Sequence, residues 1–162
     1  MEFPDRKRIR IPQYDYSQNG AYFVTVCTYE RRKILAETGR GGALLRPIGK
    51  SAEEELLKLP ERYKYVSIDK FVVMPNHIHA IISIDRPARA EQSPAPTISE
   101  IICTFKSITA KTANKMDGTP GRQIWQRSFN DHVIRCDEEY TEIWRYIDDN
   151  PRKWEEDGLF VP

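Results

Sequence analysis

Two histidines one residue apart, His77 and His79, have the residue type and spacing best suited to chemistry. They begin the segment HIHAIISI, residues 77–84, whose β-branched composition is typical of a strand. Alternate residues of a strand share a face, so both imidazoles should point one way, with Ile78 and Ile82 pointing the other. Neutral imidazoles placed side by side are a ready pair of metal ligands. Two surface histidines on a half-exposed strand are the alternative, and the spacing alone does not choose between them.

The last predicted helix, residues 137–150, holds the second group of candidates. At about 100° per residue, its apolar positions form one stripe, which predicts the face toward the core. This stripe consists of Tyr140, Ile143, Trp144 and Ile147. Tyr146 and Asn150 are four residues apart and lie on one line beside the stripe, so we expect them at the edge of the contact with the sheet. A boundary tyrosine and an asparagine that ends the helix before Pro151 would explain the same pattern.

Four strands and three helices should position these side chains. The strands are expected at residues 21–29, 65–74, 77–84 and 129–136. The helices are expected from Ser51 to residues 60–62, from Thr97 onward, and from residue 137 to 150. The order β-α-ββ-α-β-α predicts an α+β fold in which helices lie against a central antiparallel sheet.

Turns and loops complete this organisation. Pro75-Asn76 should close a tight hairpin between the second and third strands. The glycines at positions 39, 41 and 42, with Pro47, predict a loop. Residues 1–20 are a basic, turn-rich N-terminal segment, and residues 86–97 are a proline-rich surface loop. Nothing in the sequence indicates an internal repeat or a boundary, so residues 1–162 are expected to form one domain.

Composition excludes several classes of protein. The 162 residues are 40% hydrophobic and 30% charged, with a mean hydropathy of -0.62, which is typical of a soluble globular domain. No apolar run is long enough to span a membrane, and the first residues do not resemble a signal peptide. Three cysteines are far apart in the sequence: Cys27, Cys103 and Cys136. A disulfide framework and a cysteine zinc site are therefore not expected, and a reducing cytoplasm is.

Charge is unevenly distributed although the net charge is only +1. Residues 1–33 carry seven basic side chains against four acids, whereas residues 137–162 carry nine acids against three bases. A basic front permits a local nucleic-acid footprint. Ordinary solvated faces explain the same distribution equally well.

A family resemblance connects these features. Residues 71–79, FVVMPNHIH, resemble the His-hydrophobic-His signature of the single-tyrosine HUH transposases, the insertion-sequence 200-like family. Five further segments resemble blocks of the REP-associated branch of that family. They are residues 22–28, 105–107, 124–129, 131–135 and 146–151. Their joint order and spacing, from residue 22 to residue 154, make the resemblance specific.

The resemblance implies a fold, a site and an activity. The fold would be a ferredoxin-like or RRM-like α/β sandwich. Tyr146 matches the nucleophilic tyrosine, His77 and His79 match the metal-binding pair, and Asn150 matches a third ligand that is typically glutamine in the insertion-sequence relatives. A divalent ion, Mg²⁺ or Mn²⁺, would then assist Tyr146 in cleaving and rejoining single-stranded DNA through a 5′-phosphotyrosine link.

The same resemblance implies partners. Lys106 and Arg127 lie within family blocks and are candidate phosphate contacts, against the alternative of solvated cations. Single-stranded or hairpin DNA would be the substrate, no membrane partner is expected, and some relatives act as homodimers. Aromatic residues such as Tyr22 and Trp125 could stack on bases, but core packing is their commoner role. His132, next to Asp131, is better explained as a structural histidine.

Two other functions remain as alternatives. A non-catalytic nucleic-acid-binding module on an RRM-like sheet would present aromatic residues on its central strands, where this chain has histidines. A small two-histidine oxygenase would need a carboxylate as its third ligand, and the His77 motif contains none.

Overall fold

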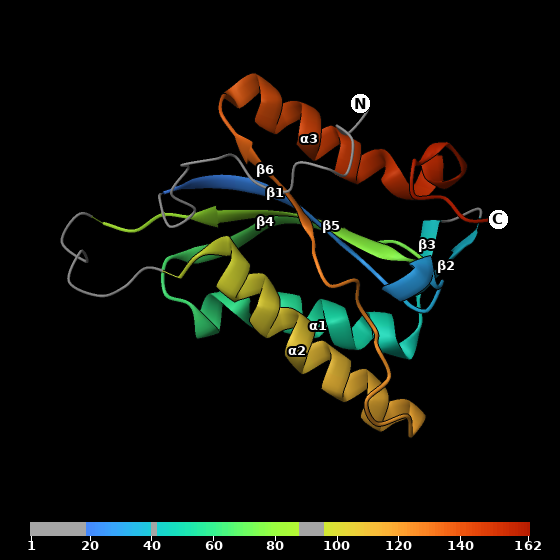
Figure 1. The fold of residues 1–162 in the computed structure, drawn as a ribbon. Coiled ribbons are helices and arrows are strands. Elements are labelled where there is room, and N and C mark those ends of the chain that lie inside the picture. The colour runs from blue at the N-terminus through green and yellow to red at the C-terminus, as the bar shows by residue number, and fades with distance from the viewer. Residues whose placement is uncertain (1–18, 40–41, 88–95) are drawn as a thin grey trace.

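A four-stranded antiparallel sheet forms the centre of the fold, shown as a computed structural model in Figure 1. The structure describes residues 19–39, 42–87 and 96–162. The strand order is β4-β5-β1-β6. The strands are β1 (Gly20–Cys27), β4 (Val66–Val73), β5 (His77–Ile84) and β6 (Asn130–Ile134). Nearly all of the basic segment 1–20, most of the loop 86–97, and Gly41 lie outside the described residues.

Helices cover both faces of this sheet (Figure 1). Helices α1 (Pro47–Arg62) and α2 (Ile98–Asp117) lie on one face, and α3 (Asp137–Asp149) lies on the other. Without the small β2-β3 hairpin, the elements through β6 follow the β-α-β-β-α-β order of ferredoxin-like folds. The expected α+β sandwich with a central antiparallel sheet is therefore confirmed. No helix in the described part of the chain is long and apolar enough to cross a membrane.

Helix α2 begins where the sequence indicates. The Thr97 hydroxyl accepts a hydrogen bond from the Glu100 backbone N–H at 3.1 Å, and the Glu100 carboxylate accepts one from the Thr97 N–H at 3.0 Å. This reciprocal capping box satisfies two N–H groups that the first turn of a helix leaves unpaired. The helix ends at Gly118, whose φ of 62° is readily adopted by glycine.

Two expectations about residues 36–62 were wrong. A small hairpin, β2 (Ala36–Gly39) paired with β3 (Gly42–Leu45), occupies much of the expected loop. Gly39 and Gly42 pair with each other at the end of this hairpin, so they belong to short strands rather than to an irregular segment. Helix α1 begins at Pro47 instead of Ser51, because the fixed φ of proline suits the first helical position.

The predicted apolar stripe of α3 is only partly buried. Ile143 and Ile147 are each 1% exposed and pack against Phe23 and Ile81 of the sheet. Trp144 is 37% exposed, contrary to the prediction, and the Lys70 ammonium lies 5.0 Å from its ring centroid. A helix packed along the line of Ile143 and Ile147 leaves the neighbouring line, which includes Trp144, at the margin of the sheet. The Tyr140 hydroxyl, expected in the packing, instead donates to Asp69 Oδ2 at 2.8 Å.

Candidate metal and nucleophile site

His77 and His79 lie side by side on the face of β5 that α3 covers. They are 0% and 1% exposed, so they are not the surface histidines of the alternative interpretation. Their ring centroids are 4.5 Å apart. Ile78 and Ile82 point to the opposite face, into the core under α1 and α2. The alternation expected from the sequence is thus confirmed.

Hydrogen bonds fix the ring of His77. Asn76 Nδ2 donates to the Leu159 carbonyl at 2.8 Å, which turns Asn76 Oδ1 toward His77. That oxygen lies 2.7 Å from His77 Nδ1 and can only accept, so Nδ1 carries the proton. In the neutral ring, the lone pair of His77 Nε2 then points into the site. This is the tautomer that a histidine needs in order to bind a metal through Nε2.

His79 is held by contacts on two sides. Its Nδ1 lies 2.8 Å from the Thr25 hydroxyl, and its ring stacks on Phe23 with centroids 5.3 Å apart. Burial and the neighbouring His77 lower the pKa of His79 to about 4. The imidazole is therefore neutral at neutral pH, which is its ligating form.

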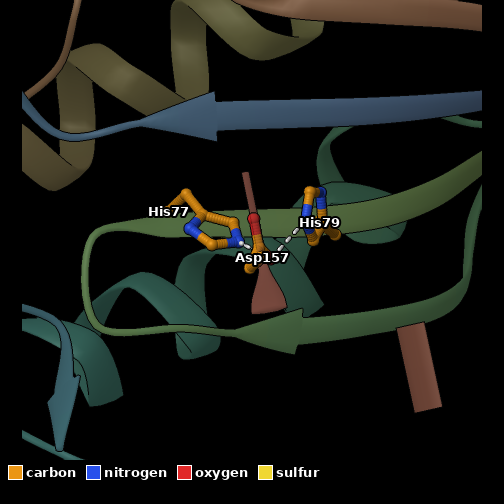
Figure 2. Close-up of side chains that lie close together, drawn as sticks. All are labelled: His77, His79 and Asp157. Atoms are coloured by element: carbon orange, nitrogen blue, oxygen red, sulfur yellow. Dashed lines mark ion pairs between the residues drawn. The ribbon is translucent and has the colours of Figure 1, made fainter. Parts of the chain in front are cut away.

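Asp157 joins the two histidines (Figure 2). Its Oδ2 lies 3.5 Å from His77 Nε2 and 3.9 Å from His79 Nε2, and its side chain is 2% exposed. One donor atom from each residue lies within 4.8 Å of the other two, a grouping that could hold a metal ion. Burial by itself raises the pKa of the Asp157 carboxyl, but its contacts with His77 and His79 outweigh burial and hold that pKa below its usual value.

Sequence reasoning missed Asp157. The residue follows η3 (Asn150–Glu156), the 3-10 segment that continues from α3 and returns the chain to the sheet. In the sequence it is one of nine acids after residue 136, and nothing in its spacing distinguishes it from the others. Only the path of the chain after α3 brings it to the histidines.

Tyr146 lies beside the histidines, as its position on α3 suggested. Its hydroxyl is 3.5 Å from His79 Nε2, and its ring meets Phe23 edge-on at 6.1 Å between centroids. Burial and the negative charge of Asp157 raise the pKa of Tyr146 well above its usual value, although a hydrogen bond with Asn150 opposes the shift. The phenol is therefore protonated at neutral pH.

Asn150 ends α3 and is only 3% exposed. Its side chain hydrogen-bonds with Tyr146, so these two residues come together as their four-residue spacing predicted. Within the described ranges, Asn150 Oδ1 is buried and has no hydrogen-bond partner. A buried oxygen of this kind can accept a hydrogen bond or bind a cation.

Lys106 and Arg127 occupy different environments. The Lys106 ammonium donates to the backbone carbonyls of Gln126 and Arg127, the latter at 3.0 Å, and so holds that loop against α2. The Arg127 side chain is exposed. Its neighbours Gln126 and Ser128 line a small pocket together with Thr25, the hydroxyl partner of His79.

The remaining candidates have structural surroundings. His132 Nε2 contacts Glu139 Oε1, which agrees with the interpretation of a structural histidine. Tyr22 and Trp125 are 0% and 4% exposed and belong to the core. Cys27 is buried, whereas Cys103 and Cys136 are exposed.

Comparisons with known proteins give a consistent result. The family model described as "Transposase IS200 like" matches residues 17–150. A protein of Haemophilus influenzae (strain ATCC 51907 / DSM 11121 / KW20 / Rd), described as uncharacterized, is 32% identical over 170 residues, covering 96% of this chain and 93% of the relative.

Two solved structures share the fold. One is a REP-associated tyrosine transposase bound to a REP hairpin, with a TM-score of 0.56 and 22% identity over 89% of this chain and 73% of the other. The second is a predicted transposase from Deinococcus radiodurans R1, with a TM-score of 0.53 and 14% identity over 86% of this chain and 95% of the other.

Proposed function

The chain belongs to the IS200-like transposase family, and on that premise we propose that it cleaves and rejoins single-stranded DNA through Tyr146. Family membership makes it a DNA-processing enzyme of the transposase type. The observation that carries the finer proposal is the position of the Tyr146 hydroxyl, 3.5 Å from His79 Nε2 although the two residues are 67 positions apart. A tyrosine hydroxyl beside two imidazoles that can bind a metal is an arrangement suited to metal-assisted phosphodiester cleavage.

We propose that His77, His79 and Asn150 hold a divalent ion, Mg²⁺ or Mn²⁺. The residues fit such an ion because His77 Nε2 and Asn150 Oδ1 are buried without hydrogen-bond partners among the described residues. Two imidazole nitrogens favour Mn²⁺ over Mg²⁺, which prefers oxygen ligands. When bound there, the ion would polarise the scissile phosphate and stabilise the charge that develops on it.

Tyr146 would perform the covalent step. Its phenolic oxygen bonds to phosphorus as the bond from phosphorus to the 3′ oxygen breaks, which leaves a 5′-phosphotyrosine link and a free 3′-hydroxyl. Because its raised pKa keeps the phenol protonated, the proton must leave during the attack, and the departing 3′ oxygen gains one. The covalent link conserves the energy of the broken phosphodiester, so rejoining needs no ATP.

Hairpin-containing single-stranded DNA is the proposed substrate, and REP-element processing or transposition is the proposed role. This is supported by the solved transposase of similar fold, which is bound to a REP hairpin. We propose Arg127 as an exposed phosphate contact. We propose that Lys106 supports the loop that carries Arg127, since its ammonium already contacts the carbonyls of that loop. DNA as the substrate also favours a cytoplasmic location.

The alternative functions fit less well. An RRM-like binding sheet needs exposed aromatic residues, but Tyr22 and Phe23 of β1 are 0% and 2% exposed, and helices cover both faces. The oxygenase alternative gains a carboxylate in Asp157, so the sequence argument against it was incomplete. The tyrosine beside the histidines and the family membership nevertheless favour DNA cleavage.

The test is a covalent adduct with DNA. Wild-type protein incubated with Mn²⁺ and an end-labelled single strand containing a hairpin should give a labelled band that survives a denaturing gel, and peptide mapping should place it on Tyr146. Tyr146→Phe should give no adduct and no cleavage.

Tyr140→Phe is the matched control. It removes a hydroxyl from the same helix, but that hydroxyl is bound to Asp69, so cleavage should be unchanged. An adduct on a different tyrosine, or cleavage by Tyr146→Phe, would contradict the assignment.

A further inference from the structure

We propose that Asp157 is a further protein ligand of the divalent ion, so that His77, His79 and Asp157 bind the ion in addition to Asn150. The role of the ion in DNA cleavage rests on the proposed function. The identity of its ligands does not. The assignment of Asp157 gives a role to a segment that lies beyond the residues matched by the family.

The geometry of the three donor atoms is close to that of a coordination shell. An ion about 2.1 Å from each ligand separates neighbouring donors by about 3.0–3.6 Å. Asp157 Oδ2 lies 3.5 Å from His77 Nε2 and 3.9 Å from His79 Nε2. All three donor atoms lie within 4.8 Å of one another, so they must move closer together by up to about 1–2 Å to close the shell.

Burial supplies the second argument. Among the residues described, His77 Nε2 and Asp157 Oδ2 have no hydrogen-bond partner, and both side chains are almost completely buried. The contacts of Asp157 Oδ2 with the histidines, at 3.5 and 3.9 Å, are longer than hydrogen bonds, and a buried carboxylate oxygen without a hydrogen bond is unfavourable. A cation between these two atoms would satisfy both of them.

Leu159 provides the third argument, because its backbone orients two of the ligands. Its N–H donates to Asp157 Oδ1 at 2.8 Å, which turns Oδ2 toward the histidines. Its carbonyl accepts from Asn76 Nδ2 at 2.8 Å, and Asn76 in turn orients His77. Hydrogen bonds that orient ligands from behind are a regular feature of metal sites.

Aromatic packing holds this segment in place. The Trp154 ring lies 5.8 Å from the His77 ring, and Phe160 packs edge-on against Trp154 at 5.2 Å between centroids. Asp157 lies between these two aromatic residues in the chain, so its position is fixed on both sides.

A simple ion pair between Asp157 and a protonated His77 is the competing explanation. It requires a proton on His77 Nε2 directed at Asp157 Oδ2. These atoms are 3.5 Å apart and form no hydrogen bond, which an ion pair buried to this extent would need.

The two explanations are separated by Asp157→Asn. Asparagine keeps an oxygen that can accept from the Leu159 N–H, so the local fold is preserved, but it presents an amide nitrogen to the histidines. Calorimetry of the full chain with Mn²⁺, in the absence of DNA, should show affinity at least about tenfold weaker than wild type. Glu156→Gln, the same chemical change at the adjacent exposed residue, should bind as wild type does.

Thermal unfolding provides a second measurement, in which Asp157→Asn should not lower the stability of the metal-free protein although it weakens Mn²⁺ binding. In EDTA, Asp157→Asn should unfold at a temperature equal to or above that of wild type, because without the ion Asp157 Oδ2 is buried with no hydrogen-bond partner among the described residues, and the variant places no charge there. With saturating Mn²⁺, wild type should gain more stability than the variant. Unchanged Mn²⁺ affinity, or lower stability of the variant in EDTA, would overturn the proposal and support the ion pair.

Failure of the proposed function would look different. Tyr146→Phe should bind Mn²⁺ like wild type, because its hydroxyl is not needed to hold the ion. If wild type binds Mn²⁺ through Asp157 yet cleaves no DNA, the cleavage proposal fails and the ligand assignment stands. If wild type cleaves DNA while Asp157→Asn binds Mn²⁺ normally, the ligand assignment alone fails.

Discussion

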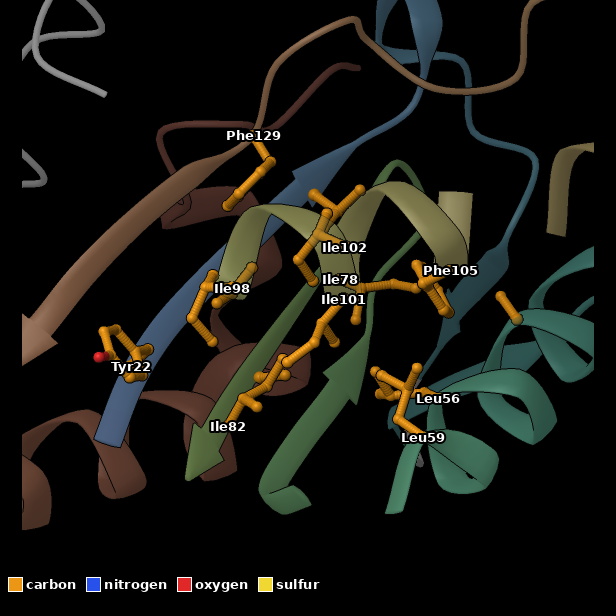
Figure 3. Close-up of a cluster of buried hydrophobic side chains, with 14 of the residues drawn as sticks. Tyr22, Leu56, Leu59, Ile78, Ile82, Ile98, Ile101, Ile102, Phe105 and Phe129 are labelled. Atoms are coloured by element: carbon orange, nitrogen blue, oxygen red, sulfur yellow. The ribbon is translucent and has the colours of Figure 1, made fainter. Parts of the chain in front are cut away.

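Strand β5 sends Ile78 and Ile82 to the face of the sheet covered by α1 and α2, and His77 and His79 to the face covered by α3. The first face meets a large apolar cluster (Figure 3), built from the strands and from residues of both helices such as Leu56. The second face has a much smaller buried apolar cluster: Phe23, Ile81, Ile143 and Ile147.

The two faces of the sheet differ in what they contribute: one mainly to the stability of the fold, the other to the candidate site. Apolar burial stabilises a fold roughly in proportion to area, so most of the stability should come from the α1/α2 face. On the α3 face, buried atoms such as His77 Nε2, Asn150 Oδ1 and Asp157 Oδ2 lack hydrogen-bond partners among the described residues, which reduces stability. On the proposed function, the α3 face binds the ion and carries the reaction, and the other face stabilises the fold.

The largest expected effect comes from replacing both His77 and His79 with alanine. Cleavage should fall by at least about 10³-fold, because metal assistance contributes several kcal/mol of transition-state stabilisation. Mn²⁺ binding measured by calorimetry should disappear, while circular dichroism should show an intact fold. Unchanged Mn²⁺ binding would place the ion elsewhere and break the distinction between the two faces.

Ile101→Ala tests the opposite face. Ile101 is 0% exposed in the core under α1 and α2, so the substitution should lower the free energy of unfolding by about 2–5 kcal/mol, measured by urea denaturation. Cleavage per folded molecule should be unchanged.

Ile143→Ala, on the α3 face, is the matched comparison for Ile101→Ala. Ile143 packs with the residues that hold Tyr146 beside His79, so its loss should reduce cleavage as well as stability. Equal cleavage by the two alanine variants would show that α3 packing does not position the nucleophile.

Gly49→Ala should produce an intermediate effect on stability. A Cβ at Gly49 of α1 would lie 1.9 Å from the Leu35 carbonyl oxygen, so the helix or the backbone of Leu35 must shift. Overpacking of this kind costs about 1–3 kcal/mol of unfolding free energy, measurable by urea denaturation. At Gly158, beside Asp157, an added Cβ meets nothing within 4 Å, so Gly158→Ala should be nearly neutral.

Local sequence patterns predicted the residues that lie on regular elements. Alternation along β5 placed His77 and His79 on one face, and the four-residue spacing of Tyr146 and Asn150 placed them together on α3. Both predictions depend on a period of two or of 3.6 residues, which the backbone enforces.

The patterns failed where the answer depended on how elements meet. Asp157 reaches the histidines only because the chain turns back after α3, and no local period encodes that turn. Trp144 belongs to the apolar stripe of α3 by period, but it is 37% exposed and lies beside Lys70 of the edge strand β4. The β2-β3 hairpin was missed because its strands are only four residues long, so alternation is too brief to be distinguished from a loop.

Tyr140→Phe should have the smallest effect on the free energy of unfolding. It tests the edge of the contact between α3 and the sheet. The Tyr140 hydroxyl donates to Asp69 Oδ2, and the Asp69 carboxylate also accepts from Ser67 and Ser83. Because these serines remain after the substitution, the loss should be about 1 kcal/mol of unfolding free energy at neutral pH. Cleavage should be unchanged, since this hydroxyl faces Asp69.

The unfolding free energy that Tyr140→Phe removes should also depend on pH in a defined direction. Burial and the bond to Asp69 raise the pKa of Tyr140 to about 12, from about 10 in the unfolded chain. A raised folded-state pKa means that the unfolded chain releases this proton first, so the stabilisation is complete below about pH 10 and is lost as the pH rises toward 12. The difference in stability between wild type and Tyr140→Phe, measured by urea denaturation, should therefore shrink over that range. A difference in stability that stays constant with pH would mean that the Tyr140 hydroxyl contributes through packing. The edge of α3 would then resemble the apolar face under α1 and α2 more than the face that carries the candidate site.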